Sequence, residues 1–143
     1  MVDLHSVSDA AYAGLVFDAD FDCGNLNSVE HRGGSEFVLT TRNDVAGVPR
    51  RASWFHFSVR QAQGENGCGT PPWAGRILSF EVRNMNPLNA LYDQGMRPVV
   101  RSLPSQPHWK RLAEYTKTSG GKDGQSFAIH FTHVISSPPG DPL

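Results

Sequence analysis

Six histidines are the side chains of this sequence best suited to bind a metal ion or to transfer a proton near neutral pH. A zinc site of the His-x-x-Glu kind needs a glutamate three residues after a histidine, and no histidine here has one. His130 and His133 are three residues apart, but on a strand such residues point to opposite faces. We therefore interpret the histidines as ordinary core or surface residues. They are His5, His31, His56, His108, His130 and His133.

Three aspartates near the N-terminus have the spacing of the opening of a calcium-binding loop. They are Asp18, Asp20 and Asp22. Such a loop also needs glycine at its sixth position and glutamate at its twelfth, and Cys23 and Val29 occupy those positions. The same spacing is typical of one face of a β-strand. We therefore predict a solvated strand face and no calcium site.

The sequence contains no known motif for nucleophilic catalysis or phosphate binding. It has no Gly-x-Ser-x-Gly and no Gly-x-x-x-x-Gly-Lys-Ser/Thr. Its two cysteines, Cys23 and Cys68, are too few for a disulfide-stapled fold. We interpret both as reduced thiols, although a single disulfide is compatible with the sequence. The glycine-rich residues 120–124 are interpreted as a turn.

Three tryptophans are available for packing or for ligand binding: Trp54, Trp73 and Trp109. Exposed tryptophans on a sheet can form a platform for a peptide or a sugar. Packing in the core or against a second domain is the favoured interpretation, because most of the surface of a tryptophan side chain is usually buried.

Four basic residues lie close together in the second half of the sequence: Arg97, Arg101, Lys110 and Arg111. Most charged groups at a protein surface are simply solvated. The alternative is a basic surface that faces an acidic substrate, because a cluster of one sign attracts ligands of the opposite sign.

Composition excludes several classes of function. The 143 residues include 13 basic and 14 acidic side chains, for a formal net charge of −1. Nucleic-acid binding as the main role would need a strong basic excess. No apolar run approaches the roughly 18 residues of a membrane span, and the N-terminus lacks the pattern of a secretory signal. No Asn-x-Ser/Thr sequon occurs either, which fits an intracellular protein.

Alternation with period two dominates the chain and predicts β-strands. In the clearest example, Phe127, Ile129, Phe131 and His133 would share one face. Strands of this kind must lay their apolar face on another layer, and few helices are available to supply it. We therefore predict an all-β fold, an antiparallel β-sandwich with one short helix. The predicted strands are residues 15–22, 37–41, 54–59, 78–83, 127–133 and, more weakly, 110–118, and the predicted core includes Phe57, Phe80, Ile129 and Phe131.

The one short helix is predicted over residues 88–94. Asn86 could cap its N-terminus, Pro87 suits the first turn, and Gly95 could end it in a left-handed conformation. The glycine- and proline-rich residues 61–75 are predicted as a long loop. Residues 1–135 would then form one domain, and the Ser- and Pro-rich residues 136–143 would begin a linker to an absent domain.

From Asn84 to Pro98, an Asn-x-x pattern leads through Leu91-Tyr92 to Gly95-Met96-Arg97-Pro98. This stretch resembles the signature of the N-terminal domain of the cytosolic carboxypeptidases, a family of zinc metallopeptidases. Other stretches resemble the same domain in the same order, so the resemblance runs from Phe17 to Val134. These stretches are Phe21–Leu26, Ser53–Val59, Val100–Pro104, Pro107–Arg111 and Phe127–Val134.

The resemblance implies an antiparallel β-sandwich that precedes a zinc carboxypeptidase domain. In the family, two histidines and one glutamate bind the zinc and a further glutamate is the general base, all in the downstream domain. None of these has a counterpart in this sequence. The resemblance therefore implies no catalytic residue, no metal ligand and no cofactor in this chain. The chain would instead serve the folding, support and substrate access of its own downstream domain.

The resemblance is nearest to the branch of the family that removes branch-point glutamates from tubulin, although residues 61–75 depart from the family pattern. It implies C-terminal or side-chain glutamates as the substrates, acidic tubulin tails as partners, and a cytoplasmic, microtubule-associated location. A self-standing module that binds a peptide or a glycan is the alternative. The residues expected to face the second domain or an acidic substrate are Trp54, Tyr92, Met96, Arg97, Arg101, Trp109, Lys110 and Arg111.

Overall fold

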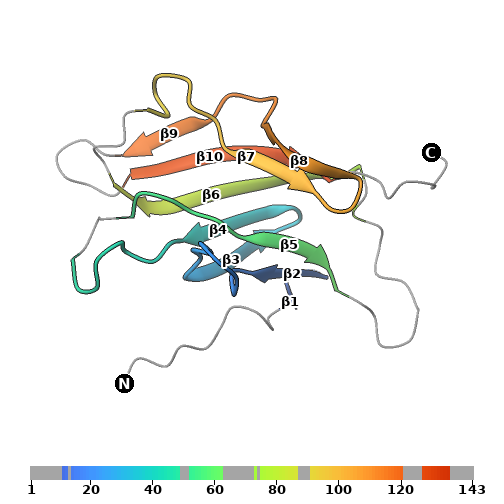
Figure 1. Ribbon diagram of the computed structural model, residues 1–143, viewed down its shortest axis with the longest axis horizontal. Coiled ribbons are helices and arrows are strands. Elements are labelled where there is room, and N and C mark those ends of the chain that lie inside the picture. Colours follow the sequence, from blue (N-terminus) through green and yellow to red (C-terminus); the bar gives the residue numbers. More distant parts are fainter. Residues whose placement is uncertain are drawn as a thin grey trace.

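The structure, a computed structural model, describes residues 11–12, 14–48, 52–62, 73, 75–86, 91–120 and 127–135 (Figure 1). These residues form ten β-strands and contain no helix, which confirms the predicted all-β class. Among them there is accordingly no helix of the length and apolarity needed to cross a membrane. Cys68, residues 136–143 and most of the predicted loop over residues 61–75 lie outside the described residues.

Five strands form the larger sheet, in the spatial order β3-β4-β6-β10-β9 (Figure 1). Neighbouring strands are antiparallel except β4 and β6, which run parallel with Phe37 opposite Phe80. Between β6 and β10, Phe131 lies opposite Phe80 and His133 lies opposite Leu78. The five strands are β3 (Ser28–Gly33), β4 (Glu36–Thr40), β6 (Ile77–Met85), β9 (Lys117–Gly120) and β10 (Phe127–Val134).

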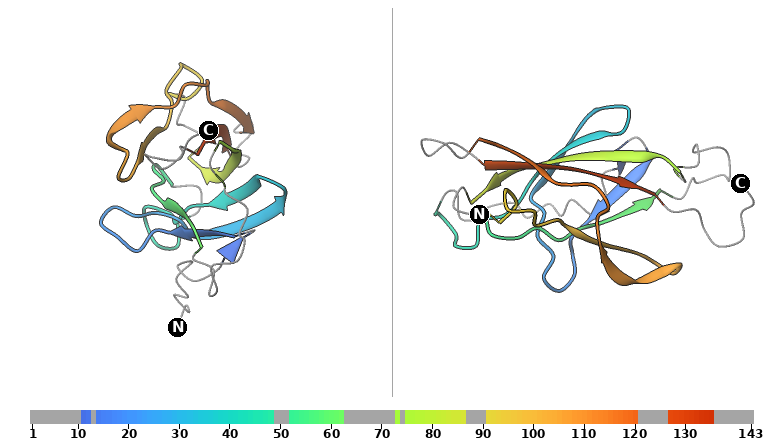
Figure 2. Two further views of the ribbon diagram at one scale, coloured as in Figure 1. Left: turned by 90° about the vertical axis from the view of Figure 1, so that its right-hand side faces the viewer. Right: turned by 90° about the horizontal axis from the view of Figure 1, so that it is seen from above.

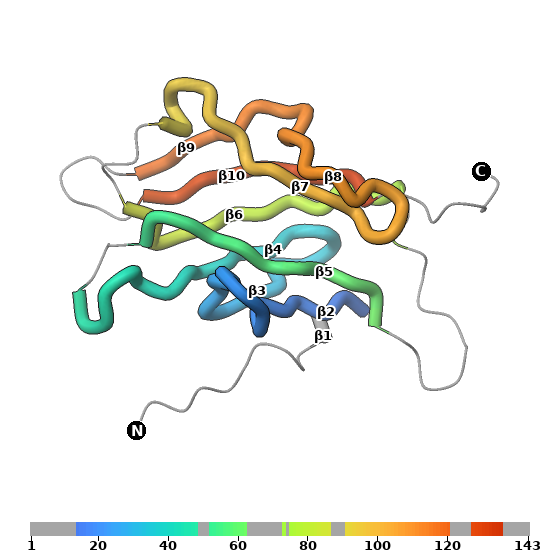
Figure 3. The backbone as a smooth tube through the Cα atoms, in the orientation of Figure 1, coloured from blue at the N-terminus to red at the C-terminus, as the bar shows by residue number. Residues whose placement is uncertain are grey.

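The second layer consists of two separate pieces. One is a three-stranded sheet of β1 (Ala11–Tyr12), β2 (Leu15–Asp18) and β5 (Ser58–Gln61), with β2 in the middle. The other is a hairpin of β7 (Val99–Ser102) and β8 (Gln106–Arg111). Figure 2 shows this hairpin standing out from the body of the domain, and Figure 3 shows residues 52–61 crossing in front of the larger sheet.

Aromatic rings fill the space between the two layers. The ring centroid of Phe17 on β2 lies 5.1 Å from that of Phe37 on β4. The ring of Phe80 on β6 lies 5.7 Å from that of Phe57 and 5.4 Å from that of Phe131 on β10. Rings at these separations attract one another in addition to removing apolar area from water. The two layers therefore share one core, as a sandwich requires.

The long strands of the larger sheet show the predicted alternation. On β6, Leu78, Phe80 and Val82 are buried, whereas Ile77 is exposed. On β10, Ile129 is fully buried. The predicted faces of both strands are confirmed, because each strand has the core on one side and the outer surface on the other.

The strand predicted over residues 15–22 is wrong beyond Asp18. The backbone N–H of Asp20 donates to Oδ1 of Asp18 at 2.8 Å, and the chain turns away from the sheet there. Phe21, which would share the buried face of Phe17 if the strand continued, is 38% exposed. The aspartates therefore belong to a strand end and a turn, and not to one strand face.

The strand predicted over residues 54–59 begins only with β5. The segment before it makes a single bridge, between His56 and Asn25. Phe57 nevertheless packs against the core as predicted, and Trp54, on the other face, is exposed. Extended backbone without a full ladder is sufficient to keep this alternation.

The weak strand predicted over residues 110–118 is in fact two strands. β8 ends at Arg111 and β9 begins at Lys117. Between them the side chain of Leu112 is buried, and its backbone N–H donates to the carbonyl oxygen of Pro98 at 2.9 Å. This apolar anchor fixes the loop and separates the hairpin from the larger sheet.

Residues 91–95 form a turn and not the predicted helix. The N–H of Met96 donates to the carbonyl oxygen of Leu91, and the N–H of Gly95 donates to that of Tyr92. This pair of bonds is the pattern with which helices end. Gly95 has a φ of 95°, the left-handed conformation expected for it. Residues 88–90 of the predicted helix lie outside the described residues.

Candidate functional site

The residues predicted to form a functional surface fall into separate groups. The hairpin group is the most accessible, because every residue of β8 is exposed. The groups are Arg101, Trp109, Lys110 and Arg111 on the hairpin, Tyr92, Met96 and Arg97 in the segment before it, and Trp54 in the segment before β5.

A row of side chains, which we call the aromatic ladder, joins the hairpin to the rest of the domain. The guanidinium of Arg101 lies 4.7 Å from the centroid of the Trp109 ring, in a cation–π contact. The ring of Trp109 lies 5.6 Å from that of His56, and His56 lies 4.8 Å from Phe21. Local sequence patterns do not reveal the parts of His56 and Phe21, because these contacts join segments that are distant in sequence.

The side chains of Tyr92 and Arg97, in the segment before the hairpin, make contacts within the domain. Nη1 of Arg97 donates to the carbonyl oxygen of Ala113 at 2.9 Å, and its guanidinium lies 5.4 Å from the centroid of the Tyr115 ring. Tyr92 is a core residue, and burial raises the pKa of its hydroxyl, which therefore stays protonated at neutral pH. Of this group, Met96 has the most exposed side chain.

The three tryptophans have different environments. Nε1 of Trp54 donates to the carbonyl oxygen of Cys23 at 3.2 Å, while much of its ring is exposed. Trp109 is exposed on β8, within the aromatic ladder. Trp73 is only 3% exposed. An exposed aromatic platform would therefore consist of Trp54 and Trp109 and would exclude Trp73.

A cleft of about 890 Å³ lies between the hairpin and the two sheets. Its floor is apolar and includes Leu78, Phe80 and Phe131 from the larger sheet. Polar side chains, among them His56, Gln61 and His133, are also part of the lining. Burial lowers the pKa of His133, so its ring is neutral at pH 7. The walls of the cleft are residues 55–61 and 98–105.

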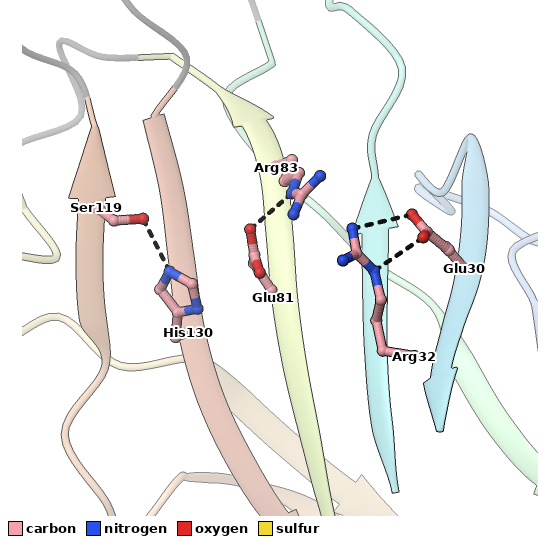
Figure 4. Close-up of polar contacts among 6 residues, drawn as sticks. All are labelled: Glu30, Arg32, Glu81, Arg83, Ser119 and His130. Atoms are coloured by element: carbon pink, nitrogen blue, oxygen red, sulfur yellow. Dashed lines mark hydrogen bonds and ion pairs between the residues drawn. The ribbon is translucent and has the colours of Figure 1, made fainter. Parts of the chain in front are cut away.

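The outer face of the larger sheet is polar (Figure 4). The hydrogen bond from Arg83 holds the pKa of Glu81 below its usual range. Exposed pairs of this kind contribute little to stability, so we interpret this face as a solvated surface. The contacts drawn are Glu30 with Arg32 at 2.8 Å, Glu81 with Arg83 at 2.6 Å, and Ser119 Oγ with His130 Nε2 at 2.9 Å.

The described ranges contain no group of three or more His, Cys, Asp or Glu side chains that could hold a metal ion. Nε2 of His31 makes a hydrogen bond of 2.9 Å with the carbonyl oxygen of Gly34. His130 lies on the outer face and His133 in the cleft, so this pair points to opposite faces as predicted. Cys23 is a free, exposed cysteine.

Comparison with protein families decides the identity of the domain. The family model described as "Cytosolic carboxypeptidase N-terminal domain" matches residues 17–137. The chain belongs to the cytosolic carboxypeptidase family. This confirms the resemblance drawn from the sequence motifs, and the match runs from within β2 to beyond the end of β10.

Relatives of this N-terminal domain are much longer proteins. The chain is 37% identical over 147 residues to Cytosolic carboxypeptidase-like protein 5 of Rattus norvegicus, with 84% of the chain and 16% of the rat protein aligned. It is 34% identical over 152 residues to the Homo sapiens protein of the same name, with 84% and 15% aligned. It is 30% identical over 122 residues to Cytosolic carboxypeptidase 3 of Bos taurus, with 82% and 11% aligned. The chain thus spans 11% to 16% of these three relatives.

In this cytosolic carboxypeptidase N-terminal domain, motif residues have structural roles. Asn84 has a φ of 57°, its Oδ1 accepts from the N–H of Thr41 at 2.9 Å, and its Nδ2 donates to the carbonyl oxygen of Thr41 at 2.8 Å. Gly24 leaves no space for a side chain, since a Cβ there would lie 1.9 Å from the carbonyl oxygen of Ala19. These positions hold the sandwich together and do not line the cleft.

Proposed function

We propose that this chain is the non-catalytic N-terminal domain of a zinc carboxypeptidase, and that it supports a downstream catalytic domain and restricts what enters it. Two observations support the proposal: the family match over residues 17–137, and relatives of which the chain spans 11% to 16%. The family name, cytosolic carboxypeptidase, supports a cytoplasmic peptidase as the parent protein.

Zinc chemistry belongs to the downstream domain in this proposal. The side chains described by the structure do not fit a zinc centre, because no three candidate ligands come together among them. No metal ligand and no catalytic step are therefore assigned to this chain. Its contribution would be to position and shield the catalytic domain.

The exposed hairpin is the observation that carries the docking role. Every residue of β8 is exposed, and Leu103 at the tip is 67% exposed. A two-stranded hairpin is only marginally stable by itself in water. Val99, Leu103 and Trp109 are the exposed large apolar side chains of the hairpin, and grouped apolar side chains at a surface mark contact sites. We therefore place the contact with the catalytic domain on the β7–β8 hairpin, with the aromatic ladder at its base.

Association between this chain and a separately produced catalytic domain tests the docking role. Leu103→Asp places a charge in the apolar contact, so the dissociation constant should rise by about tenfold or more. Val45→Asp is the matched control, because Val45 is also exposed, at 55%, but lies in the loop after β4. Equal affinity of the Leu103→Asp and natural chains would contradict docking through the hairpin.

We further propose that the parent enzyme removes C-terminal or side-chain glutamates from proteins such as tubulin, at or near microtubules. The motif resemblance to the branch-point subtype supports this. So do Lys110 and Arg111, whose positive charges are exposed on β8. Oppositely charged groups attract an acidic tail over a range set by the ionic strength.

Salt dependence tests whether the hairpin meets acidic tails. Binding of a poly-glutamate peptide to the full-length enzyme should weaken steeply as salt rises. It should also weaken in the Lys110→Gln/Arg111→Gln double variant but not in Arg42→Gln, which removes an exposed charge outside the hairpin. An affinity that changes neither with the salt concentration nor in the double variant would contradict this role.

A further inference from the structure

Positive charge is concentrated on one short stretch of this chain. Residues 97–113, which include the β7–β8 hairpin, contain four basic side chains and no acidic one. Since the whole chain has a formal net charge of −1, subtracting these four positive charges leaves −5 for the other residues. A charge distribution as segregated as this attracts an oppositely charged ligand to one place on the surface.

Three of these cations, Arg101, Lys110 and Arg111, are exposed and have no carboxylate partner in the described part of the chain. The ion pairs found there lie on β3 and β6. The guanidinium of Arg101 lies over the ring of Trp109, a contact that leaves its positive charge in place. Nζ of Lys110 donates to Oε1 of Gln106 at 3.4 Å, which is a neutral acceptor. The three charges are therefore available to the carboxylates of a ligand.

The strand that bears two of these cations, β8, has a free edge. Among the described residues β8 pairs only with β7, so its other side has no strand partner. The hairpin also projects from the body of the domain (Figure 2). An edge of this kind presents backbone N–H and C=O groups to which an added strand can bond. With six residues, β8 is as long as most strands of globular proteins.

The hydrogen bonds at the base of the hairpin show which backbone groups face the free edge. The N–H of Leu112 donates to the carbonyl oxygen of Pro98, so these two residues occupy a bonded position. Bonded and non-bonded positions alternate along an antiparallel pair. Val99 and Arg111 form the next position, so the N–H and C=O of Arg111 point away from β7. Pro107, which has no N–H to donate, is of the kind tolerated at sheet edges.

The charges beside the free edge select the strand that it accepts. Lysine and proline on an edge oppose pairing with apolar or basic strands, including β8 of a second copy. They do not oppose an acidic strand, because opposite charges on facing residues stabilise a strand pair. Lys110 and Arg111 are adjacent, so their side chains extend to opposite faces of β8. An extended peptide with acidic residues at successive positions meets both, whereas a polyphosphate lacks the amides that bond to an edge.

We propose that β8 binds an acidic peptide by strand addition: the peptide lies extended along the free edge, bonds to the backbone of Arg111 and places carboxylates against Lys110 and Arg111. The inference rests on the proposed function, because it takes the acidic tail proposed to meet the hairpin and assigns it a backbone-bonded site. Lys110 and Arg111 lie opposite Val100 and Val99, at the base of the hairpin. The contact proposed around Leu103 is at the tip, so the two sites are separate.

A peptide with a methylated backbone separates strand addition from simple charge attraction. The isotope-labelled 143-residue chain is titrated at low salt with a capped peptide of six glutamates, and with the same peptide N-methylated at every glutamate. Methylation keeps all the carboxylates but removes every N–H, so the dissociation constant should rise by about tenfold or more. Equal affinity of the two peptides would overturn strand addition and leave the charge-based proposal standing. Binding of neither peptide would overturn both.

Backbone amide signals and two variants locate the site. The N–H of Arg111 should become protected from solvent exchange when the unmethylated peptide binds, whereas that of Leu112, already bonded to Pro98, should not change. Tripolyphosphate carries charge but no amides and should not protect Arg111; equal protection by it would overturn the inference. Lys110→Gln should weaken peptide binding by about two- to fivefold. Lys117→Gln, on the edge strand β9, should not, and equal effects of the two variants would also overturn the inference.

Discussion

The side-chain amide of Asn25 donates a hydrogen bond to the backbone carbonyl oxygen of Trp54 at 2.9 Å. On its other side, Oδ1 of Asn25 accepts from the backbone N–H of Arg42 at 2.7 Å. The backbone of Asn25 also exchanges two bonds with His56, at 2.8 and 3.2 Å. Asn25 is only 2% exposed, so this one residue joins three chain segments inside the domain.

Replacing Asn25 by Ala should destabilise the fold. Backbone groups of Trp54 and Arg42 would lose their partner, and each buried group left unpaired costs about 1–3 kcal/mol. Chemical denaturation measures the effect as a lower midpoint. Asn27→Ala is the control, because Asn27 is exposed and bonds only to the Thr40 hydroxyl through its side chain. Equal midpoints for the two variants would mean that the Asn25 bonds are not structural.

Gly24→Ala should be more damaging than other glycine substitutions. Its Cβ would meet the carbonyl oxygen of Ala19 at 1.9 Å, so the turn would have to open, at a cost of about 3 kcal/mol or more. Gly47→Ala is the matched control. Gly47 has a φ of 77° and open space around it, so that change costs about 1–2 kcal/mol. A smaller loss for Gly24→Ala than for Gly47→Ala would contradict the close approach at Ala19.

Phe131→Ala tests the parity of β10. Phe131 packs against both Phe55 and Phe80, so truncation should cost about 3–5 kcal/mol of unfolding free energy. Val134→Ala on the same strand should cost no more than about 0.5 kcal/mol, because Val134 is exposed. An unchanged denaturation midpoint for Phe131→Ala would show that the faces of the strand have been reversed.

The long strands could be predicted from sequence because their two faces have different environments. β6 and β10 each have the core on one face and the outer surface on the other, and their residues alternate accordingly. β3 and β8 could not be predicted, because almost all of their residues are exposed and no apolar alternation marks them. The glycines at 33 and 34, which turn β3 into β4, were the only local signal.

The candidate site was predictable only in part. Residue type alone makes Trp109 and Arg101 candidates for a binding surface, and the structure brings the two side chains together. Phe21 and His56 join them through contacts across the fold that local patterns do not encode. Trp73 looks like any core tryptophan in the sequence. Only the structure shows that its buried Nε1 has no hydrogen-bond partner among the described residues.

Acid should destabilise the domain partly through His133. Burial lowers the pKa of His133 in the folded state, so the unfolded chain binds this proton more readily. Stability is then greatest above the unfolded pKa of about 6.5 and falls as the pH drops toward the folded value. His133→Gln should therefore lose less unfolding free energy between pH 7.5 and pH 5 than the natural chain.

A matched substitution separates this effect from a general loss of stability. His108→Gln replaces an exposed histidine on β8 and should keep the pH dependence of the natural chain. Glu81 does not contribute in this range, because the hydrogen bond from Arg83 lowers the pKa of its carboxyl group. If His133→Gln and His108→Gln show the same pH dependence, the burial of His133 does not affect acid stability.

Peptidase activity of the purified 143-residue chain tests most directly whether this domain is a support for chemistry located elsewhere. The chain is incubated with a poly-glutamate peptide and added zinc, and free glutamate is measured. Release no greater than in the protein-free control is expected. Zinc-dependent release of glutamate by this chain alone would contradict the assignment.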